Sequence, residues 1–178
     1  MGGVSWRGLR ASLSSVGVPV GLAVTLALPA MLAAQTTATF ATLGTGCRGP
    51  SGTPKMVAVQ NSTPIIGKQF QVSLTALPNA VYNSAIGVVG LSKTRWKGKP
   101  LPMDLTPMGI TGCSMYVSPD HMEPVLNRGG TATWTMNVPN IAGIVGSTVY
   151  LQAWVIDGHA NPGAVLVTNA GEAKLGTR

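Results

Sequence analysis

Two short segments hold acidic and histidine residues close enough together to share chemistry. SPDHMEP brings Asp120, His121 and Glu123 together, and DGH brings Asp157 near His159. Carboxylate and imidazole groups at such spacing could bind a metal ion or act as a general acid and base. A secreted hydrolase or metalloprotein would require Asp120, His121, Asp157 and His159 to converge in one pocket.

Ordinary turn structure is the favoured interpretation of both segments. Their spacing matches no established ligand pattern, and prolines or glycines flank the aspartates, which often bond their own backbone in turns. The chain also lacks the nucleophile-elbow, zinc-protease, phosphate-loop and dinucleotide-binding motifs. We therefore predict no catalytic residue, no cofactor and no resident metal.

The stretch SKTRWKGKP gathers basic side chains around Trp96, namely Lys93, Arg95, Lys97 and Lys99. If it is extended, the four basic residues share one face and could bind an acidic polysaccharide or another anionic envelope polymer. Alternatively it is a solvated edge whose lysines discourage aggregation, with Trp96 packed inward. Binders of single-stranded nucleic acid use several aromatic platforms. The single tryptophan favours the solvated edge, and nucleic acid is not an expected partner.

The aromatic residues allow a second kind of ligand site. Trp96, Trp154, Tyr116 and Tyr82 could form a platform on which sugar rings stack, or they could pack in the core as such residues often do. A carbohydrate-binding module predicts that some of Trp96, Tyr116 and Trp154 are exposed on one face. Both interpretations stay open at the level of sequence.

Cys47 and Cys113 are the two cysteines of the chain. A small, even number of cysteines in an exported protein indicates a disulfide. The bridge would close a loop of about 66 residues and stabilise the fold by roughly 4 kcal/mol. A metal site would need more ligands, and a redox pair is normally separated by two residues.

The amino-terminal region has the pattern of a secretory signal peptide. Arg7 and Arg10 precede residues 16–34, which are uncharged and mostly apolar, and the segment ends in small residues at Ala34. We predict a signal peptide over residues 1–34.

A membrane anchor is the alternative, and Pro19 and Pro29 make it less favourable. No second apolar segment of spanning length follows, so no membrane span is expected after signal removal. Residues 35–178 then carry ten basic and five acidic residues, a formal charge of about +5, which suits weak attraction to an anionic surface. The predicted location is extracellular or at the cell surface, with the periplasm as an alternative.

Residues that could do chemistry must be positioned by strands, because strand patterns dominate the chain. KQFQVSLTAL places Phe70, Val72 and Leu74 on one face, and TATWTMNVP alternates in the same way. Further apolar runs bounded by turn residues cover 56–60, 85–92, 113–118, 148–157 and 164–168.

This pattern predicts an all-β protein, an antiparallel β-sandwich of about seven or eight strands that is immunoglobulin-like or jelly-roll-like. Residues 148–156 are apolar on both faces, as in a central strand. We expect a flexible lead-in over 35–46 and a single domain over 47–178. Residues 97–112 contain three prolines and read as a long irregular connection.

Four stretches of the chain have a distinctive sequence and occur in this order: GTGCRGPSGTP, GLSKTRWKGKPLPMDL, GCSMYVSPD and VYLQAWVIDGHANPGAVLVTNA. They resemble an uncharacterised module of exported proteins from planctomycetes and related environmental bacteria, over about residues 44–178. The shared positions are Cys47, Trp96, Pro100, Pro102, Asp104, Cys113, Tyr116, Pro119, Asp120, Tyr150, Gln152 and Asp157. The resemblance implies a Cys47–Cys113 pair and a structural Trp96, and it gives no activity. In that module, positions such as 93, 95 and 97 are often polar or small.

Together these observations predict an exported, non-enzymatic structural or interaction module. The alternatives are a carbohydrate- or polyanion-binding module and a self-assembling surface or filament subunit. A secreted hydrolase or metalloprotein is the least favoured.

Overall fold

The computed structural model describes residues 35–79 and 84–178, so the predicted signal peptide lies outside the described residues. One sheet contains, in spatial order, β1 (Thr39–Leu43), β12 (Val165–Lys174), β11 (Thr148–Ile156), β4 (Ser84–Gly90) and β9 (His121–Leu126). The other contains β10 (Ala132–Asn137), β3 (Gln69–Thr75) and β2 (Lys55–Ala58). All pairings between these strands are antiparallel. Within the described ranges no helix is long and apolar enough to span a membrane.

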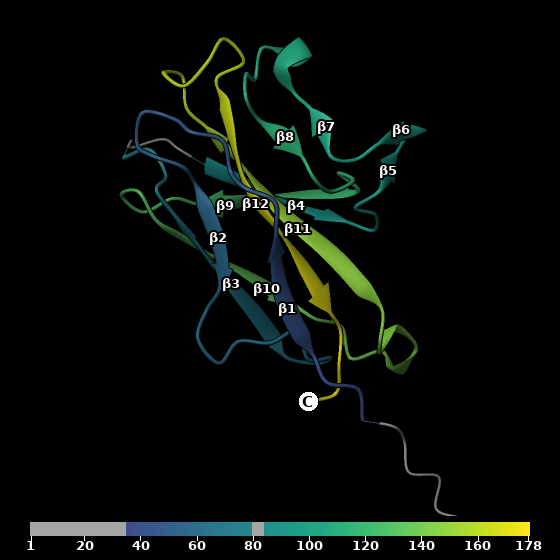
Figure 1. The fold of residues 1–178 in the computed structure, drawn as a ribbon. Coiled ribbons are helices and arrows are strands. Elements are labelled where there is room, and N and C mark those ends of the chain that lie inside the picture. Colours follow the sequence, from purple (N-terminus) through teal and green to yellow (C-terminus); the bar gives the residue numbers. More distant parts are fainter. Residues whose placement is uncertain (1–34, 80–83) are drawn as a thin grey trace, which may run out of the picture. The chain divides into compact units, whose positions relative to one another are not determined.

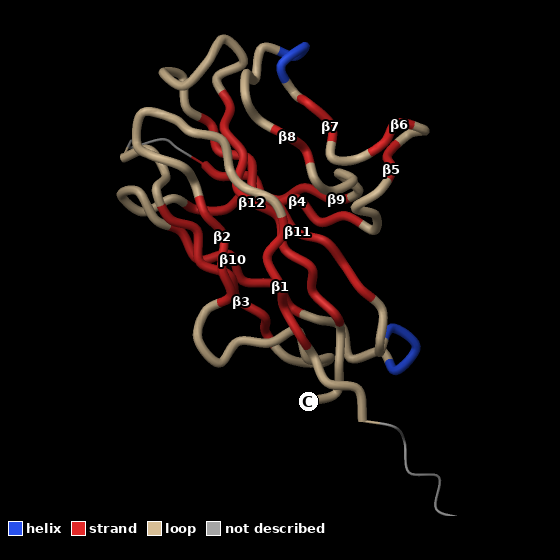
Figure 2. The backbone as a smooth tube through the Cα atoms, viewed as in Figure 1, coloured by secondary structure: helices blue, strands red, loops and turns tan. Residues whose placement is uncertain are grey.

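The two sheets pack face to face as a β-sandwich (Figures 1 and 2). The predicted inward residues Phe70, Val72 and Leu74 are buried, as is Trp134 on the neighbouring strand β10. Trp134 lies against Gly87 of β4, where the Cβ atom of any larger residue would come within 2.5 Å of the indole ring. The all-β, antiparallel prediction is therefore confirmed, and Gly87 leaves room for the tryptophan that joins the sheets.

The expected lead-in over 35–46 is wrong, because it contains strand β1. β1 pairs with β12, and the centre of the Phe40 ring lies 5.3 Å from that of the Phe70 ring. The sequence TFATL has little alternation between large apolar and polar residues. Phe40 is placed by a partner strand more than 120 positions away, which no local pattern reveals.

Strand β9 is not among the predicted strands, and β12 continues beyond position 168 to Lys174. β9 has the sequence HMEPVL, whose proline and charged residues resemble a turn. It is an edge strand that pairs with β4 alone, and an edge position tolerates a proline that a central strand would not.

The connection between β4 and β9 covers part of the outer face of the five-stranded sheet. It contains the hairpin β5 (Arg95–Trp96) and β6 (Lys99–Pro100), the pair β7 (Met103–Asp104) and β8 (Ser114–Met115), and the 3-10 turn η1 (Thr106–Met108). A second 3-10 turn, η2 (Ala142–Ile144), precedes β11. The predicted irregular stretch 97–112 is thus built of short paired strands and turns.

Under this connection lies a second, smaller apolar cluster of Val88, Val117 and Ala170. Gln152 of β11 is fully buried there, and its side chain accepts the Tyr116 N–H and donates to the Ser114 and Thr168 carbonyl oxygens. The middle of β11 is therefore covered on both faces, which explains its apolar sequence.

A disulfide joins Cys47 to Cys113 at the base of the connection, as predicted. The Cys47 N–H donates to the Val167 carbonyl at 3.1 Å, which fixes this cysteine against β12. The disulfide and the Gln152 side chain therefore both fasten the β4–β9 connection to the five-stranded sheet.

Candidate functional site

Three aspartates accept hydrogen bonds from backbone or hydroxyl groups, and the sequence analysis assigns two of them, Asp120 and Asp157, to turns. Asp157 Oδ1 accepts the His159 N–H at 3.0 Å, and Asp104 Oδ1 accepts the Thr106 N–H at 2.9 Å. Asp120 Oδ2 accepts the N–H of Leu91 at 2.7 Å and the Ser118 hydroxyl at 2.6 Å. Asp157 therefore lies in a turn, as predicted. The turn prediction for SPDHMEP is wrong, because residues from His121 onward form strand β9 and the Asp120 carboxylate bonds Leu91, 29 positions away.

The pKa of Asp104 lies below its usual range because its carboxylate accepts the Thr106 N–H first and the Thr106 hydroxyl second. A lowered pKa in the folded state means that the ionised form stabilises the fold. This contribution is present above the unfolded pKa of about 3.9 and is lost as the pH falls through the folded value. Asp104 therefore serves the turn that begins η1.

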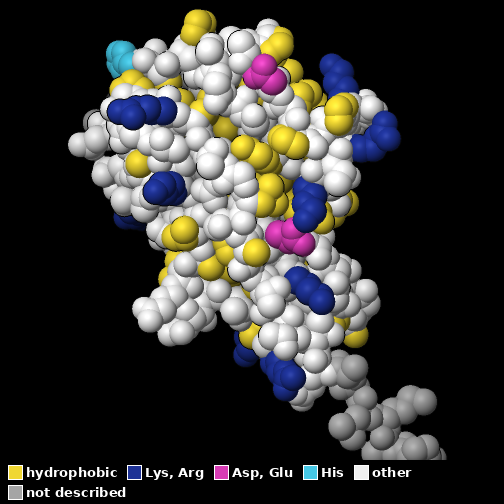
Figure 3. All heavy atoms as spheres, viewed as in Figure 1, with side chains coloured by type: hydrophobic (Ala, Val, Ile, Leu, Met, Phe, Trp, Pro, Cys, Tyr) yellow, Lys and Arg dark blue, Asp and Glu magenta, His cyan; other side chains and the backbone are white. Residues whose placement is uncertain are grey.

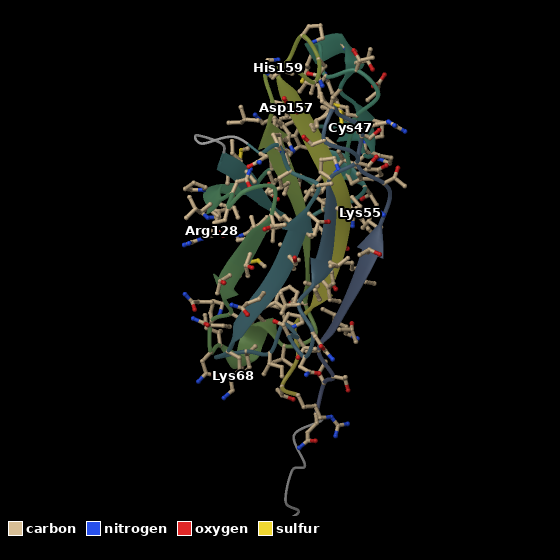
Figure 4. All side chains as sticks on the ribbon, turned by 90° about the vertical axis from the view of Figure 1, so that its left-hand side faces the viewer. Cys47, Lys55, Lys68, Arg128, Asp157 and His159 are labelled. Atoms are coloured by element: carbon tan, nitrogen blue, oxygen red, sulfur yellow. A yellow bond between two sulfur atoms is a disulfide. The ribbon has the colours of Figure 1, made fainter. Side chains whose placement is uncertain are left out.

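The four metal candidates do not converge. Asp157 and His159 line a polar pocket of about 400 Å³ with Pro50 and Pro78, and Figure 4 shows both at one end of the domain. His121 lines a different groove. Across residues 35–79 and 84–178, no three histidine, cysteine or acidic side chains are close enough to hold one metal ion. The convergence that a metalloprotein or hydrolase requires is therefore not found among these residues.

The basic stretch forms a tight hairpin instead of an extended ridge. Lys97 and Gly98 both have positive φ, 45° and 80°, which is the conformation of a two-residue hairpin turn. Strand register then places Lys99 opposite Trp96 and Arg95 opposite Pro100. The face of four basic residues that an extended stretch would present is therefore not formed, because the turn reverses the chain after Trp96.

Trp96 anchors this hairpin. It is half-buried and packs against the main core, as the structural interpretation predicted. Lys97 Nζ lies 4.8 Å from the centre of the indole ring, and Arg95 Nη2 donates to the Gly98 carbonyl. These contacts stiffen the hairpin tip and hold two positive charges near it.

Lys93 forms an ion pair, unlike the three other basic residues of SKTRWKGKP. Its Nζ pairs with Glu172 Oε2 of β12 and lies 5.5 Å from the Tyr150 ring centre. The hydrogen bond to Glu172 raises the pKa of Lys93, and desolvation opposes that shift. The pair stabilises the fold below the ordinary lysine pKa and loses this effect as the pH rises through the raised value.

Arg95, Lys97 and Lys99 stay exposed at the hairpin. Among the described residues, Lys93 and Glu172 form the one ion pair. Figure 3 shows basic side chains at the upper right edge of the molecule, where Figure 1 places the β5–β6 hairpin, and others scattered over the same face. The hairpin therefore presents a small cationic tip of three residues.

The aromatic residues do not form an open platform. Trp96, Tyr116 and Trp154 are all half-buried, and Tyr82 lies outside the described residues. The Tyr116 ring fills the space beside Gly44, and its hydroxyl oxygen accepts the Thr45 N–H. The Trp154 Nε1 atom is buried and has no acceptor within the part of the chain described. These three side chains serve packing first.

Sequence reasoning missed a groove of about 460 Å³ between the edges of β9 and β10. Its floor includes the core residues Phe70, Leu151 and Ala173, and its rim includes His121 and Glu123. Glu123 Oε1 accepts the Trp134 Nε1–H and is thus tied to β10. No sequence signal marks this groove, since its lining comes from several separate strands and the loops beside them.

Comparison with protein-family models found no match for this chain, and comparison with curated proteins found none either. The resemblance to the planctomycete module therefore stays a prediction.

Proposed function

We propose that this chain is an exported structural or interaction module of the cell surface or extracellular space, without catalytic chemistry of its own. One observation carries the proposal: three of the acidic side chains and the buried glutamine are engaged in holding the domain together. The carboxylates of Asp104, Asp120 and Asp157 accept backbone N–H groups, and the Gln152 side chain holds the connection between β4 and β9. The disulfide supports an oxidising compartment, where such bridges persist.

Two features of the sequence support export. Residues 1–34 have the signal-peptide pattern, and the four motif stretches resemble a module of exported bacterial proteins. A disulfide-linked scaffold whose long connection is fastened to the sheet suits a protein that must persist outside the cell.

Export has a direct test. The full-length gene expressed in a bacterial host should yield a protein in the envelope or medium that begins at Gln35 and has no free thiol. Amino-terminal sequencing and thiol titration of the fractions measure both properties. A chain kept in the cytoplasm with an intact amino terminus and free Cys47 and Cys113 would contradict export.

A second candidate function, polyanion binding, is favoured by the cationic hairpin tip. Arg95, Lys97 and Lys99 are exposed on a hairpin that Trp96 anchors, in a domain with few acidic residues. Such a tip suits an acidic polysaccharide or a phosphate-bearing envelope polymer. Binding through exposed charges should weaken as salt rises, because screening shortens their range.

For this candidate we expect the triple variant Arg95→Ser, Lys97→Ser, Lys99→Ser to lose most binding to an acidic polysaccharide at low salt. The matched control is Lys55→Ser, Lys68→Ser, Arg128→Ser, which removes three exposed charges outside the hairpin; Figure 4 labels these three residues. Retention on an immobilised polysaccharide at low and moderate salt measures the effect. Equal losses in both variants would show only a dependence on net charge.

A further inference from the structure

The three-stranded sheet has an open edge at β10. β10 pairs with β3 alone, and in the described part of the chain no strand joins it on its other side, whereas the facing sheet has five strands. The groove of about 460 Å³ between β9 and β10 lies beside this open edge. An open edge presents unpaired backbone groups, so their positions decide what can bind there.

Hydrogen bonds on the far side of β3 show which groups of β10 lie on the open edge. Gln71 of β3 lies opposite Thr135. The Gln71 N–H donates to Ser62 Oγ and its carbonyl oxygen accepts the Val59 N–H, so Gln71 bonds away from β10. Bonded and non-bonded pairs alternate along antiparallel strands, and Thr135 belongs to a non-bonded pair. Its N–H and carbonyl oxygen therefore point out from the open edge.

Asn137 is oriented in the same way. Its neighbour Val138 donates its N–H to the Lys68 carbonyl oxygen at 2.9 Å, so Val138 bonds toward the side of β3. The backbone groups of Asn137, one residue earlier, consequently point to the open edge. Thr135 and Asn137 are both exposed. Together they offer two N–H donors and two carbonyl acceptors over three residues of β10, which is the pattern that an added extended strand satisfies.

The groove suits the side chains of such a strand. Met136 lies between the two exposed residues and lines the groove, whose floor includes Val149 and Leu151 of the facing sheet. Alternate side chains of an added strand would point to the same side as Met136 and lie over this apolar floor. His121 at the rim pairs with β4 at the end opposite Ser84, so the groove is lined by residues well inside the described ranges.

An isolated chain segment fits the open edge better than the edge of a second folded copy. In a folded copy the inward side chains of β10, such as Trp134 at 3% exposed, are packed in that copy's own core and cannot enter the groove. An isolated segment has free side chains. The carboxylate of Glu123, which accepts the Trp134 Nε1–H, lines the far rim, so a basic side chain in the segment complements the groove.

We propose that the open edge of β10 binds an extended peptide segment of a partner protein by strand addition. The segment carries apolar residues at alternate positions and a basic residue next to them. Hydrogen bonds to Thr135 and Asn137 supply the affinity, and apolar side chains in the groove supply the specificity. Pairing over about three residues is at the short end of strand lengths, so we expect a dissociation constant on the order of 100 μM or weaker. This inference rests on the proposed interaction function and names its class of partner.

The test is amide hydrogen exchange of the purified protein, followed by NMR, with the peptide Lys-Val-Thr-Val-Thr-Val-Lys blocked at both ends. Exchange at the Thr135 and Asn137 amides should slow about tenfold at a peptide concentration about ten times the dissociation constant, because only unbound protein exchanges. The Met136 amide, which faces β3, should not change. The peptide has the same sign of charge as the protein, which avoids non-specific attraction.

A pair of variants at one position isolates the hydrogen bonds. Asn137→Pro removes the outward N–H and leaves the bonds to β3 in place, because an edge strand tolerates proline where its N–H faces solvent. It should weaken peptide binding by about fivefold to tenfold. The matched control Asn137→Ala keeps the N–H and should bind like wild type. Chemical-shift titration with the peptide measures both affinities.

Two control peptides test the same contacts on the wild-type protein. When the valines fill the groove, the threonine N–H groups face β10, so a peptide N-methylated at both threonines should not bind. A peptide with asparagine in place of the valines should not bind either, because it cannot fill the apolar groove. These peptides keep the test valid even if thermal melting shows that Asn137→Pro is unfolded.

Unchanged exchange at Thr135 and Asn137 with the unmodified peptide overturns the proposal, as does binding that survives N-methylation or loss of the valines. Slower exchange at Thr135 on concentrating the protein alone would assign the open edge to a second copy, and it too would overturn the proposal. Export is judged by location and strand addition by amide exchange, so either proposal can fail alone.

Discussion

Replacing both Cys47 and Cys113 with alanine should lower the free energy of unfolding by about 4 kcal/mol. The bridge joins residues 66 positions apart, so without it the unfolded chain gains a large amount of conformational freedom. Both cysteines are buried, at 5% and 1% exposed, and contribute packing that alanine partly removes. Urea unfolding of the oxidised protein and the variant measures the difference.

Reductant provides the control for this prediction. It should destabilise the wild-type protein by a similar amount and leave the double variant unchanged. If reductant does not alter the unfolding midpoint of the wild-type protein, the connection is held by its other contacts and the disulfide adds little.

The substitution Gln152→Met should lower the free energy of unfolding by roughly 3 kcal/mol, because it leaves several buried groups without partners. Methionine is similar in size to glutamine, so little volume changes. It cannot accept the Tyr116 N–H well, and it cannot donate to the carbonyl oxygens of Ser114 and Thr168. Equilibrium unfolding measures the loss, and hydrogen exchange at the Tyr116 amide reports whether the connection opens there.

The control for Gln152→Met is Gln69→Met on β3. Gln69 is exposed, so this variant should change stability by less than about 0.5 kcal/mol. Equal losses for the two variants would contradict a special role for Gln152.

The two predictions are coupled through neighbouring residues. Cys113 precedes Ser114, whose carbonyl oxygen accepts a hydrogen bond from the Gln152 side chain. If the disulfide and Gln152 hold one connection, the loss in the triple variant should be smaller than the sum of the separate losses. Additive losses would mean that each contact stabilises its own part of the fold.

The fold class could be read from the sequence because its cause is local. Phe70, Val72 and Leu74 alternate with polar residues, and alternate side chains of a strand point to opposite faces. Turn residues separate such runs, which indicates antiparallel strands in a sandwich. The disulfide could also be predicted, since two cysteines allow one intramolecular pairing.

Strands whose sequences lack a clear alternation of apolar and polar residues could not be predicted from the sequence. β1 has a weak alternation, and β9 carries Pro124 within a charged stretch, yet both are strands because a neighbouring strand supplies their partners. The basic ridge, which was the less favoured interpretation of SKTRWKGKP, is not formed for a related reason. A ridge requires an extended conformation at Lys97, but the hairpin turn at Lys97 and Gly98 divides the four basic residues.

What the sequence by itself determined is the list of strands with strong alternation, the disulfide and the absence of a familiar catalytic motif. Only the tertiary structure decided which polar groups are free. It paired Lys93 with Glu172, engaged Gln152 in the connection and separated Asp157 from His121. Contacts between residues far apart in the chain depend on how the layers pack, and local periodicity carries no information about that packing.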